Sequence, residues 1–266
     1  MEAHCSDAME HDVFSLRDKV IVITGSTRGI GKTLAQSLYE LGARIWVHGR
    51  SAQMCADVAS ELSGLWVAAD LYDPAGVSHL CDTVLADTDV VHCLINNAAM
   101  EIPRPVAELD QGYVAQTLQV NVTAPVMTTK LLLPALRSAG RASVINMTSI
   151  HQSVPYPHNS VYSMSKAALD MFTKTAALEL AQDGIRVNNL APGAIETDIN
   201  RDVIEEIGRR RFAEWIPAGR VGTTAELVGA VRYLASSASS YVTGTTLYVD
   251  GGYSQNLVRY RPTVEG

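Results

Sequence analysis

The stretch that decides the fold runs from Lys19 to Gly31 and reads KVIVITGSTRGIG. Its first part, Val20 to Ile23, is an apolar run of β-branched residues, which is typical of a buried strand. Three glycines follow, and a pattern with helical spacing begins among them. Glycine lets the backbone approach a ligand closely, and a helix N-terminus offers free N–H groups. The stretch therefore predicts a phosphate-binding turn between a first strand and a first helix.

Six further short apolar runs follow this first strand along the chain. They read RIWVHG, LWVAAD, VVHCLINNA, ASVINMTS, IRVNNLAP and TTLYVDGG. Longer segments with helical spacing lie between them, among them residues 29–42, 131–139, 162–182 and 224–238. Nearly continuous apolar strands separated by helices indicate a parallel sheet that is covered on both faces. We therefore predict an α/β chain with a single-domain, doubly wound Rossmann fold, whose seven-stranded parallel sheet has helices on both faces.

The composition fits one globular domain. The 266 residues are 47% hydrophobic and 18% charged, so we predict a domain over residues 15–255 between flexible tails at 1–14 and 256–266. A net charge of −7, with dispersed charges, disfavours nucleic acid as a partner. No apolar stretch approaches the roughly 18 residues that cross a membrane, and the acidic N-terminus is unlike a signal peptide. We expect a soluble, cytoplasmic protein without a membrane partner.

The four cysteines show no C-x-x-C spacing, and we expect them to be reduced. His92 stands next to Cys93, but neighbouring residues in a strand point to opposite faces. We therefore predict no metal site.

The end of the second strand bears on the choice of nucleotide. It reads His48-Gly49-Arg50-Ser51, where NAD-specific sites usually place a carboxylate that binds the adenosine ribose, and no carboxylate is present. Arg50, joined by Arg28 from the glycine turn, could form bidentate bonds to a ribose 2′-phosphate. The alternative is that both arginines are solvated surface charges. The pattern favours NADP as the cofactor and leaves NAD possible.

The next two strand ends also carry polar residues. Asp70 closes the third strand and is placed to accept a hydrogen bond from the adenine amino group. The sequence Asn96-Asn97-Ala98-Ala99 closes the fourth strand and would set amides and small residues against the cofactor. In both places the alternative is a cap on the following segment, since Asp and Asn favour such positions.

A tyrosine and a lysine begin the helix after the fifth strand. Tyr162 and Lys166 are four residues apart and so share one helical face. A free tyrosine, with a pKa of about 10, is a poor base at neutral pH, and a nearby ammonium would stabilise its phenolate. With ten tyrosines in the chain, this spacing alone is equally compatible with a surface pair on an amphipathic helix.

The order of all these motifs resembles the short-chain dehydrogenase/reductase family, from Leu16 to Tyr253. The glycine turn, Asn-Asn-Ala, Asn121, Ser149, Tyr162 with Lys166, and Pro192-Gly193 follow one another, and VTG at 242–244 and VDGG at 249–252 extend the match. The branch it looks most like contains glucose 1-dehydrogenase, gluconate 5-dehydrogenase and 3-oxoacyl-carrier-protein reductase. Ala99 departs from the family's usual glycine, and we expect a slight adjustment there.

The resemblance implies roles for individual residues. Tyr162 would be the acid/base, Lys166 its electrostatic partner and a ribose ligand, and Ser149 the donor to the substrate oxygen. Asn121 would hold a proton-relay water. Together with the strand-end motifs, it implies a cofactor site made of Gly25, Ser26, Thr27, Arg28, Gly29, Ile30, Gly31, Gly49, Arg50, Ser51, Asp70, Leu71, Asn97, Ala98, Ala99, Tyr162, Lys166, Pro192, Gly193, Ile195 and Thr197.

Substrate specificity should lie in a mobile segment from Ala194 to Gly222 and in the opposite loop from Ile150 to Ser160. These carry polar candidates for binding several hydroxyls, namely His151, Gln152, His158, Glu196 and Asn200. For each, the alternative is a solvent-facing loop residue. The hypothesis that follows is an NADP-dependent dehydrogenase of a sugar, sugar acid or polyol.

Two alternative functions and an oligomeric assembly also remain open. A 3-oxoacyl-carrier-protein reductase would use basic residues at the pocket mouth, and Arg201, Arg209, Arg210 and Arg211 form one such cluster. A nucleotide-binding sensor could keep the fold without turnover. The resemblance also implies a homotetramer or homodimer through the helix from Tyr162, whose small residues are Ala167, Ala168, Ala176 and Ala177. Packing against the chain's own sheet would explain the same alanines.

Overall fold

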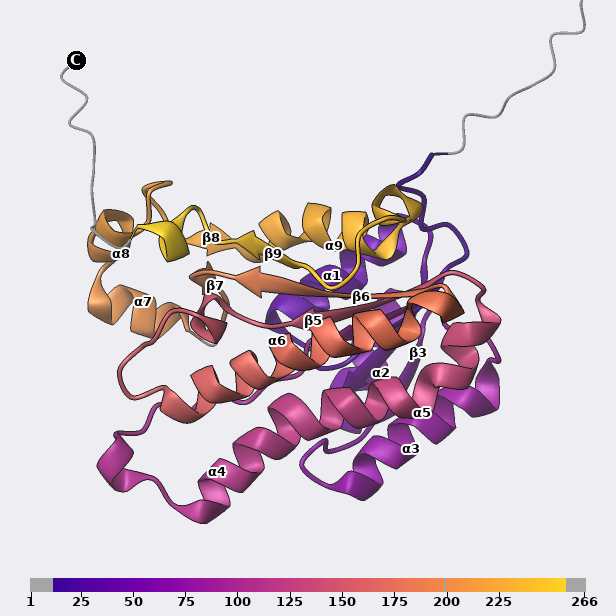
Figure 1. Cartoon of the computed structure of the whole chain (residues 1–266), viewed down its shortest axis with the longest axis horizontal. Coiled ribbons are helices and arrows are strands. Elements are labelled where there is room, and N and C mark those ends of the chain that lie inside the picture. Colours follow the sequence, from indigo (N-terminus) through magenta and orange to yellow (C-terminus); the bar gives the residue numbers. More distant parts are fainter. Residues whose placement is uncertain (1–11, 199, 257–266) are drawn as a thin grey trace, which may run out of the picture.

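The computed structural model describes residues 12–198 and 200–256, and its centre is a parallel sheet of seven strands (Figure 1). The strand order is β3-β2-β1-β4-β5-β6-β9, so the chain builds outward from β1 in one direction and then in the other. The seven strands are the seven predicted runs, namely β1 (Val20–Ile23), β2 (Arg44–Gly49), β3 (Leu65–Ala68), β4 (Cys93–Asn96), β5 (Ala142–Met147), β6 (Ile185–Pro192) and β9 (Thr246–Val249). The predicted doubly wound Rossmann fold is confirmed.

Successive strand residues feed two hydrophobic cores, one on each face of the sheet. Val22 lies in one core and Ile21 in the other, because side chains alternate across a strand. The first core packs against α3, α5 and α6, of which α5 and α6 lie in front of the strands in Figure 1, and the second packs against α1, α2 and α9. Each fully buried aliphatic side chain contributes about 1.5–3 kcal/mol.

The helices and short helical turns connect these strands. The α-helices are α1 (Gly29–Glu40), α2 (Ala52–Glu61), α3 (Pro74–Asp87), α4 (Gln111–Leu118), α5 (Ala124–Ser138), α6 (Ser160–Leu180), α7 (Arg201–Ile207), α8 (Arg209–Trp215) and α9 (Val228–Ala235). The 3₁₀ turns are η1 (Val106–Glu108), η3 (Ile150–Gln152), η4 (Ala181–Asp183), η5 (Thr224–Leu227), η6 (Ser237–Ser239) and η7 (Tyr253–Gln255), and η2 (Gln119–Thr123) is a π-helix.

Two predicted helices differ from the observed ones at their ends. The helix predicted from residue 131 begins at Ala124, directly after the π-helix η2, and Pro125 stands in its first turn. The one predicted over 224–238 is divided into η5, α9 and η6. A capping box at Thr223 and Glu226 opens η5.

The carboxyl ends of the parallel strands share one edge of the sheet, and β1 lies between β2 and β4. The direction of chain growth reverses at this point, which is where doubly wound sheets bind ligands. A second, two-stranded sheet pairs β7 (Ile195–Glu196) with β8 (Gly222–Thr223) and adjoins α7 and α8 (Figure 1).

The predicted tails fall mostly on residues 1–11 and 257–266, which lie outside the described residues. Residues 12–14, at the end of the predicted N-terminal tail, are bound to the domain. Arg232 of α9 donates to the Phe14 carbonyl at 3.0 Å and pairs with Asp12 at 3.2 Å. Within the described residues, no helix is long and apolar enough to span a membrane.

Candidate active site

One cavity of about 800 Å³ follows the carboxyl edge of the sheet from β3 to β6. Its wall contains three of the four predicted catalytic residues, Ser149, Tyr162 and Lys166. It also contains most of the predicted cofactor residues, namely Gly25, Thr27, Arg28, Gly29, Ile30, Gly31, Gly49, Arg50, Asp70, Leu71, Asn97, Ala98, Ala99, Pro192, Gly193, Ile195 and Thr197. The fold thus joins the glycine turn and the Tyr–Lys pair, which are far apart in sequence, in one site.

The glycine turn closes tightly at its two ends. Gly25 has φ +65°, and a Cβ there would lie 2.9 Å from the Cα of Ala98. A Cβ on Gly31 would overlap the carbonyl oxygen of Gly25. The Asn97 side chain donates to the Thr24 and Gly25 carbonyls at 3.0 and 2.9 Å, which fixes the turn. No side chain caps the N-terminus of α1, so its first N–H groups face the cavity and suit a phosphate.

His48 supports this turn through a hydrogen bond, a role that the sequence analysis did not predict. Its Nδ1 accepts from the Gly25 N–H at 3.1 Å, and its Nε2 lies 3.2 Å from the Ala69 carbonyl. Burial lowers the pKa of His48 to about 4, so the ring is neutral at pH 7 and Nδ1 can accept. A histidine inside the apolar run RIWVHG was the available signal, since a buried polar side chain needs partners.

Two predicted cofactor residues, Ser26 and Ser51, do not line the cavity and instead brace its walls. The Ser26 hydroxyl donates to the Ile23 carbonyl at 2.8 Å and accepts from the His48 N–H at 3.0 Å, which ties β1 to β2. Ser51 caps α2 by accepting from the Met54 N–H at 3.3 Å.

The end of the cavity beside β2, where the adenosine is predicted to bind, is cationic. Arg28 and Arg50 are exposed there, and neither forms an ion pair with a residue that the structure describes. A Cβ on Gly49 would come within 2.6 Å of the Thr27 methyl group, so a carboxylate side chain at that position would have to displace Thr27. Asp70 lines the cavity, and its carboxylate accepts from the Tyr72 N–H at 3.1 Å.

The reacting end places Tyr162, Lys166 and Ser149 together, and all three are less than a tenth exposed. The Lys166 ammonium lies 5.5 Å from the centre of the Tyr162 ring and donates to the Met147 carbonyl at 2.7 Å. Burial lowers the pKa of Lys166 to about 8 and raises that of Tyr162. The negative charge of Glu101 raises both pKa values, whereas a hydrogen bond from Ser149 lowers the pKa of Tyr162.

Asn121 lies in the π-helix η2 and is absent from the cavity wall. Its side chain accepts from the Met100 N–H at 2.7 Å and donates to the Met100 carbonyl at 2.9 Å and to the Ser165 hydroxyl at 3.0 Å. Asn121 therefore clamps the segment after β4 to α6, beside Tyr162. Because these bonds engage the Asn121 side chain, a proton-relay water would have to bind to the backbone of this π-turn. The relay role of Asn121 stays a prediction.

The fold brings only some of the five predicted substrate residues to the cavity wall. Only His151 and Asn200 line the cavity, and the Asn200 side chain is already bound to the backbone of Thr197 and Ile195. Gln152 donates to the hydroxyls of Thr246 and Tyr248, at 3.3 and 3.2 Å. His158 and Glu196 are also absent from the wall. The assignment of these five residues to the substrate stays a prediction.

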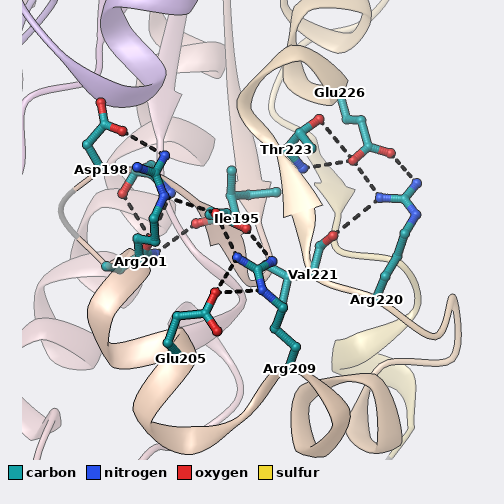
Figure 2. Close-up of polar contacts among 12 residues, drawn as sticks. Ile195, Asp198, Arg201, Glu205, Arg209, Arg220, Val221, Thr223 and Glu226 are labelled. Carbon is teal, nitrogen blue, oxygen red and sulfur yellow. Dashed lines mark hydrogen bonds and ion pairs between the residues drawn. The ribbon is translucent and has the colours of Figure 1, made fainter.

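Glu196 instead anchors α7 and α8. Its carboxylate accepts two bonds from Arg209, at 2.7 and 3.0 Å, and one from Arg201 at 3.2 Å. These bonds hold its pKa at about 2. Figure 2 shows the same arginines reaching Glu205 and Asp198, and beside them Arg220 bound to Glu226. The segment predicted to control specificity is thus cross-linked by ion pairs within itself, and Arg220 joins its end to Glu226 of η5.

The comparisons with known proteins agree with this site. A family model described as enoyl-(acyl carrier protein) reductase matches residues 25–254, which include the glycine turn and the Tyr–Lys pair. The chain belongs to the short-chain dehydrogenase/reductase family. The resemblance inferred from the motifs is therefore confirmed, and this short-chain dehydrogenase/reductase is an oxidoreductase with a nicotinamide dinucleotide as cofactor.

Relatives of this short-chain dehydrogenase/reductase act on different alcohols. It is 34% identical to glucose 1-dehydrogenase 2 of Bacillus subtilis (89% of this chain, 95% of the relative). It is 35% identical to 3beta-hydroxysteroid dehydrogenase 1 of Eggerthella lenta (89% and 94%). The crystal structure of a gluconate 5-dehydrogenase from Burkholderia cenocepacia in complex with NADP and tartrate is similar, with a TM-score of 0.87 and 32% identity (92% of this chain, 98% of that one).

Proposed function

We propose that the chain transfers a hydride between NADP(H) and the carbinol or carbonyl carbon of a small substrate. The observation that carries the proposal is the single cavity shared by the glycine turn, Arg50 and the group of Ser149, Tyr162 and Lys166. The cavity fits a dinucleotide, because its turn has no room for side chains at Gly25 and Gly31 and the N-terminus of α1 is uncapped. Bound there, the nicotinamide supplies or accepts the hydride.

Each side chain at the reacting end has a chemical role in this proposal. In reduction, the Tyr162 hydroxyl gives its proton to the carbonyl oxygen while the hydride reaches the carbonyl carbon. In oxidation, the Tyr162 phenolate takes the alcohol proton as the hydride leaves the same carbon. Lys166 stabilises the phenolate, and the Ser149 hydroxyl donates to the substrate oxygen as negative charge develops on it.

A neutral sugar or polyol is the first substrate class in the proposal. Among the polar groups on the wall near Tyr162 are the His151 Nε2 and the Glu101 carboxylate. Carboxylates bind sugar hydroxyls well because they accept up to four hydrogen bonds. The similarity to glucose 1-dehydrogenase 2 supports the same class.

A secondary alcohol with an apolar body is the second candidate, and the apolar residues of the cavity wall support it. Ile204, Ile207 and Phe212 of α7 and α8 line the cavity together with Ile102. Such a wall suits a hydrocarbon ring better than a fully hydroxylated chain, since unmatched hydroxyls are costly to bury. The similarity to a hydroxysteroid dehydrogenase fits this alternative.

A 3-oxoacyl-carrier-protein reductase receives less support, because three of the four arginines in its basic cluster form ion pairs. Arg201 and Arg209 are bound to Glu196, Arg210 pairs with Glu214 at 3.6 Å, and the Arg211 guanidinium lies 5.4 Å from the Trp215 ring centre. Paired arginines give a weak field for an acidic carrier protein.

A substrate panel read by cofactor absorbance tests the proposal. It should contain aldoses, polyols, aldonates, cyclohexanols, hydroxysteroids and acetoacetyl thioesters, each with NADP(H) and NAD(H). We expect turnover with NADP(H) on neutral alcohols or their ketones. Turnover on acetoacetyl thioesters alone would reject both leading classes.

The pH dependence should differ between the two directions. Burial raises the pKa of Tyr162 and so shifts the formation of its phenolate to higher pH. Oxidation needs the phenolate, which becomes more populated as the pH rises. The kcat/KM for oxidation should rise from about pH 7, by up to tenfold per pH unit, and should level off above the Lys166 pKa of about 8, where the ammonium that stabilises the phenolate is lost. Reduction needs the phenol and should stay level to about pH 8. An oxidation rate that falls over this alkaline range would contradict the role of Tyr162.

We also propose that the chain forms a homodimer or homotetramer through α6. Met164, Met171 and Leu178, spaced by seven residues, form an exposed apolar stripe on this helix, and Leu178 is 82% exposed. Ala167 and Ala168 lie exposed beside it, whereas Ala176 and Ala177 pack in the chain's own core. Sedimentation should give a multiple of 28.6 kDa that Leu178→Glu reduces, and a wild-type mass of 28.6 kDa would reject the assembly.

A cytoplasmic location remains part of the proposal. Cys55, Cys81 and Cys93 are buried free thiols, as expected in a reducing compartment. Cell fractionation tests the location directly.

A further inference from the structure

Glu101 is an acidic residue on the cavity wall that the proposed proton and hydride transfers do not require. Among the described residues that line the cavity, only Asp70 and Glu101 carry a carboxylate. Asp70 follows β3 at the adenosine end. Glu101 follows β4 and is the acidic residue that acts electrostatically on Tyr162 and Lys166.

The structure holds Glu101 in place from two sides. Its carboxylate accepts a 2.9 Å hydrogen bond from the side chain of Asn159, which is only 2% exposed. Its neighbour Met100 is clamped through both backbone polar groups by Asn121. These hydrogen bonds therefore restrict the Glu101 carboxylate to one position on the cavity wall.

The charge of Glu101 is not neutralised by an ion pair within the described part of the chain. The nearby ammonium of Lys166 is directed to the Met147 carbonyl. The negative charge of Glu101 is felt at Tyr162, which contacts the substrate oxygen in the proposed reaction. An anionic group of a bound substrate would be repelled in the same space, and a hydroxyl or ammonium group would be attracted.

We propose that Glu101 is a specificity-determining residue that excludes substrates bearing a carboxylate and favours those presenting hydroxyl or ammonium groups. The inference rests on the proposed function, because it places the substrate beside Tyr162. It narrows the substrate class to neutral sugars, polyols and their amino derivatives, and it sets sugar acids apart as poor substrates. The exposure of Glu101 to solvent screens its charge, so we expect discrimination of about tenfold.

Three six-carbon probes separate charge from shape. D-Glucitol, D-gluconate and D-glucamine differ only at one end of the chain, which is neutral, anionic and cationic respectively. Their dissociation constants from the protein–NADP⁺ complex are measured by NMR titration, and kcat/KM is measured for each probe that is oxidised. Binding is informative without turnover, so a failure of the proposed function stays distinguishable from a failure of this inference.

The test variant is Glu101→Gln, which removes the charge and keeps a carbonyl oxygen that can accept from Asn159. Its matched control is Glu108→Gln in η1, an exposed residue that does not line the cavity. The wild type should bind glucamine and glucitol more tightly than gluconate. Glu101→Gln should reduce the ratio of the affinity for glucitol to that for gluconate about tenfold. A salt concentration of about 0.5 M should reduce the same ratio in the wild type. The control should keep the wild-type ratio.

Three results would overturn the inference. One is wild-type binding of gluconate as tight as that of glucitol. Another is a ratio that Glu101→Gln leaves unchanged, because a purely structural acceptor for Asn159 would give that result. The third is no binding of glucitol and glucamine at all. Charge-ordered binding without turnover of any alcohol would retain the inference and reject the proposed function.

Discussion

Tyr162→Phe should lower kcat/KM in both directions by about 10³-fold or more, while the dissociation constant of NADPH changes less than about twofold. The variant loses only the hydroxyl that moves the proton, and the phenyl ring fills the same buried space. Tyr162 is 8% exposed, and its neighbours Ser149 and Lys166 stay in place. Loss of turnover without loss of cofactor binding is therefore the signature of an acid/base, and it separates this role from a structural one.

The control for this substitution is Tyr39→Phe, which removes a hydroxyl from the surface of α1, away from the active-site cavity. It should leave both rates and cofactor affinity unchanged. If Tyr162→Phe kept more than a tenth of the wild-type rate, the proton would have to come from another group, and the chemical assignment would be wrong.

Arg50→Ala should weaken NADPH binding by about 10- to 100-fold and change NADH binding by less than about threefold. Only NADPH carries the 2′-phosphate, and a charge-assisted bidentate bond to phosphate is among the stronger polar contacts. Arg50 is exposed on the cavity wall and forms no ion pair with a described residue, so its loss removes no internal contact of that kind. Fluorescence titration with both nucleotides measures the difference.

Arg44→Ala is the matched control, because Arg44 is an exposed arginine at the opposite end of the same strand. It should affect neither nucleotide. Equal losses for NADPH and NADH in Arg50→Ala would place the arginine on a part common to both nucleotides, and the preference for NADP would then have no basis at β2.

The sheet could be predicted from sequence because each strand is a short apolar run whose neighbours on both faces are helices. RIWVHG and IRVNNLAP carry that signal locally. The helices α7 and α8 were missed, since they are short and Glu196 anchors them through arginines 5 and 13 residues away. Contacts of this kind depend on the folded loop and leave no periodic pattern in the sequence.

The candidate site, like the fold, could be predicted from the sequence only in part. Tyr162, Lys166 and Ser149 could be located because their order along the chain follows the strand ends. The partners of His48 and Glu101 could not, because the Gly25 N–H and the Asn159 amide are distant in sequence and meet them only at the folded edge of the sheet. Gln152 and Glu196 were assigned to the substrate by residue type, and their side chains proved to be engaged elsewhere.

Transfer of deuterium from [4-²H]NADPH tests the central claim most directly. The protein is incubated with the deuterated cofactor, in the transferred stereoisomer, and a panel of ketones that includes ketoses and cyclohexanones. We expect one deuterium at the carbinol carbon of a product, and none at a detectable rate with Tyr162→Phe. Tight NADPH binding without deuterium transfer to any ketone would contradict it and would favour a nucleotide-binding sensor.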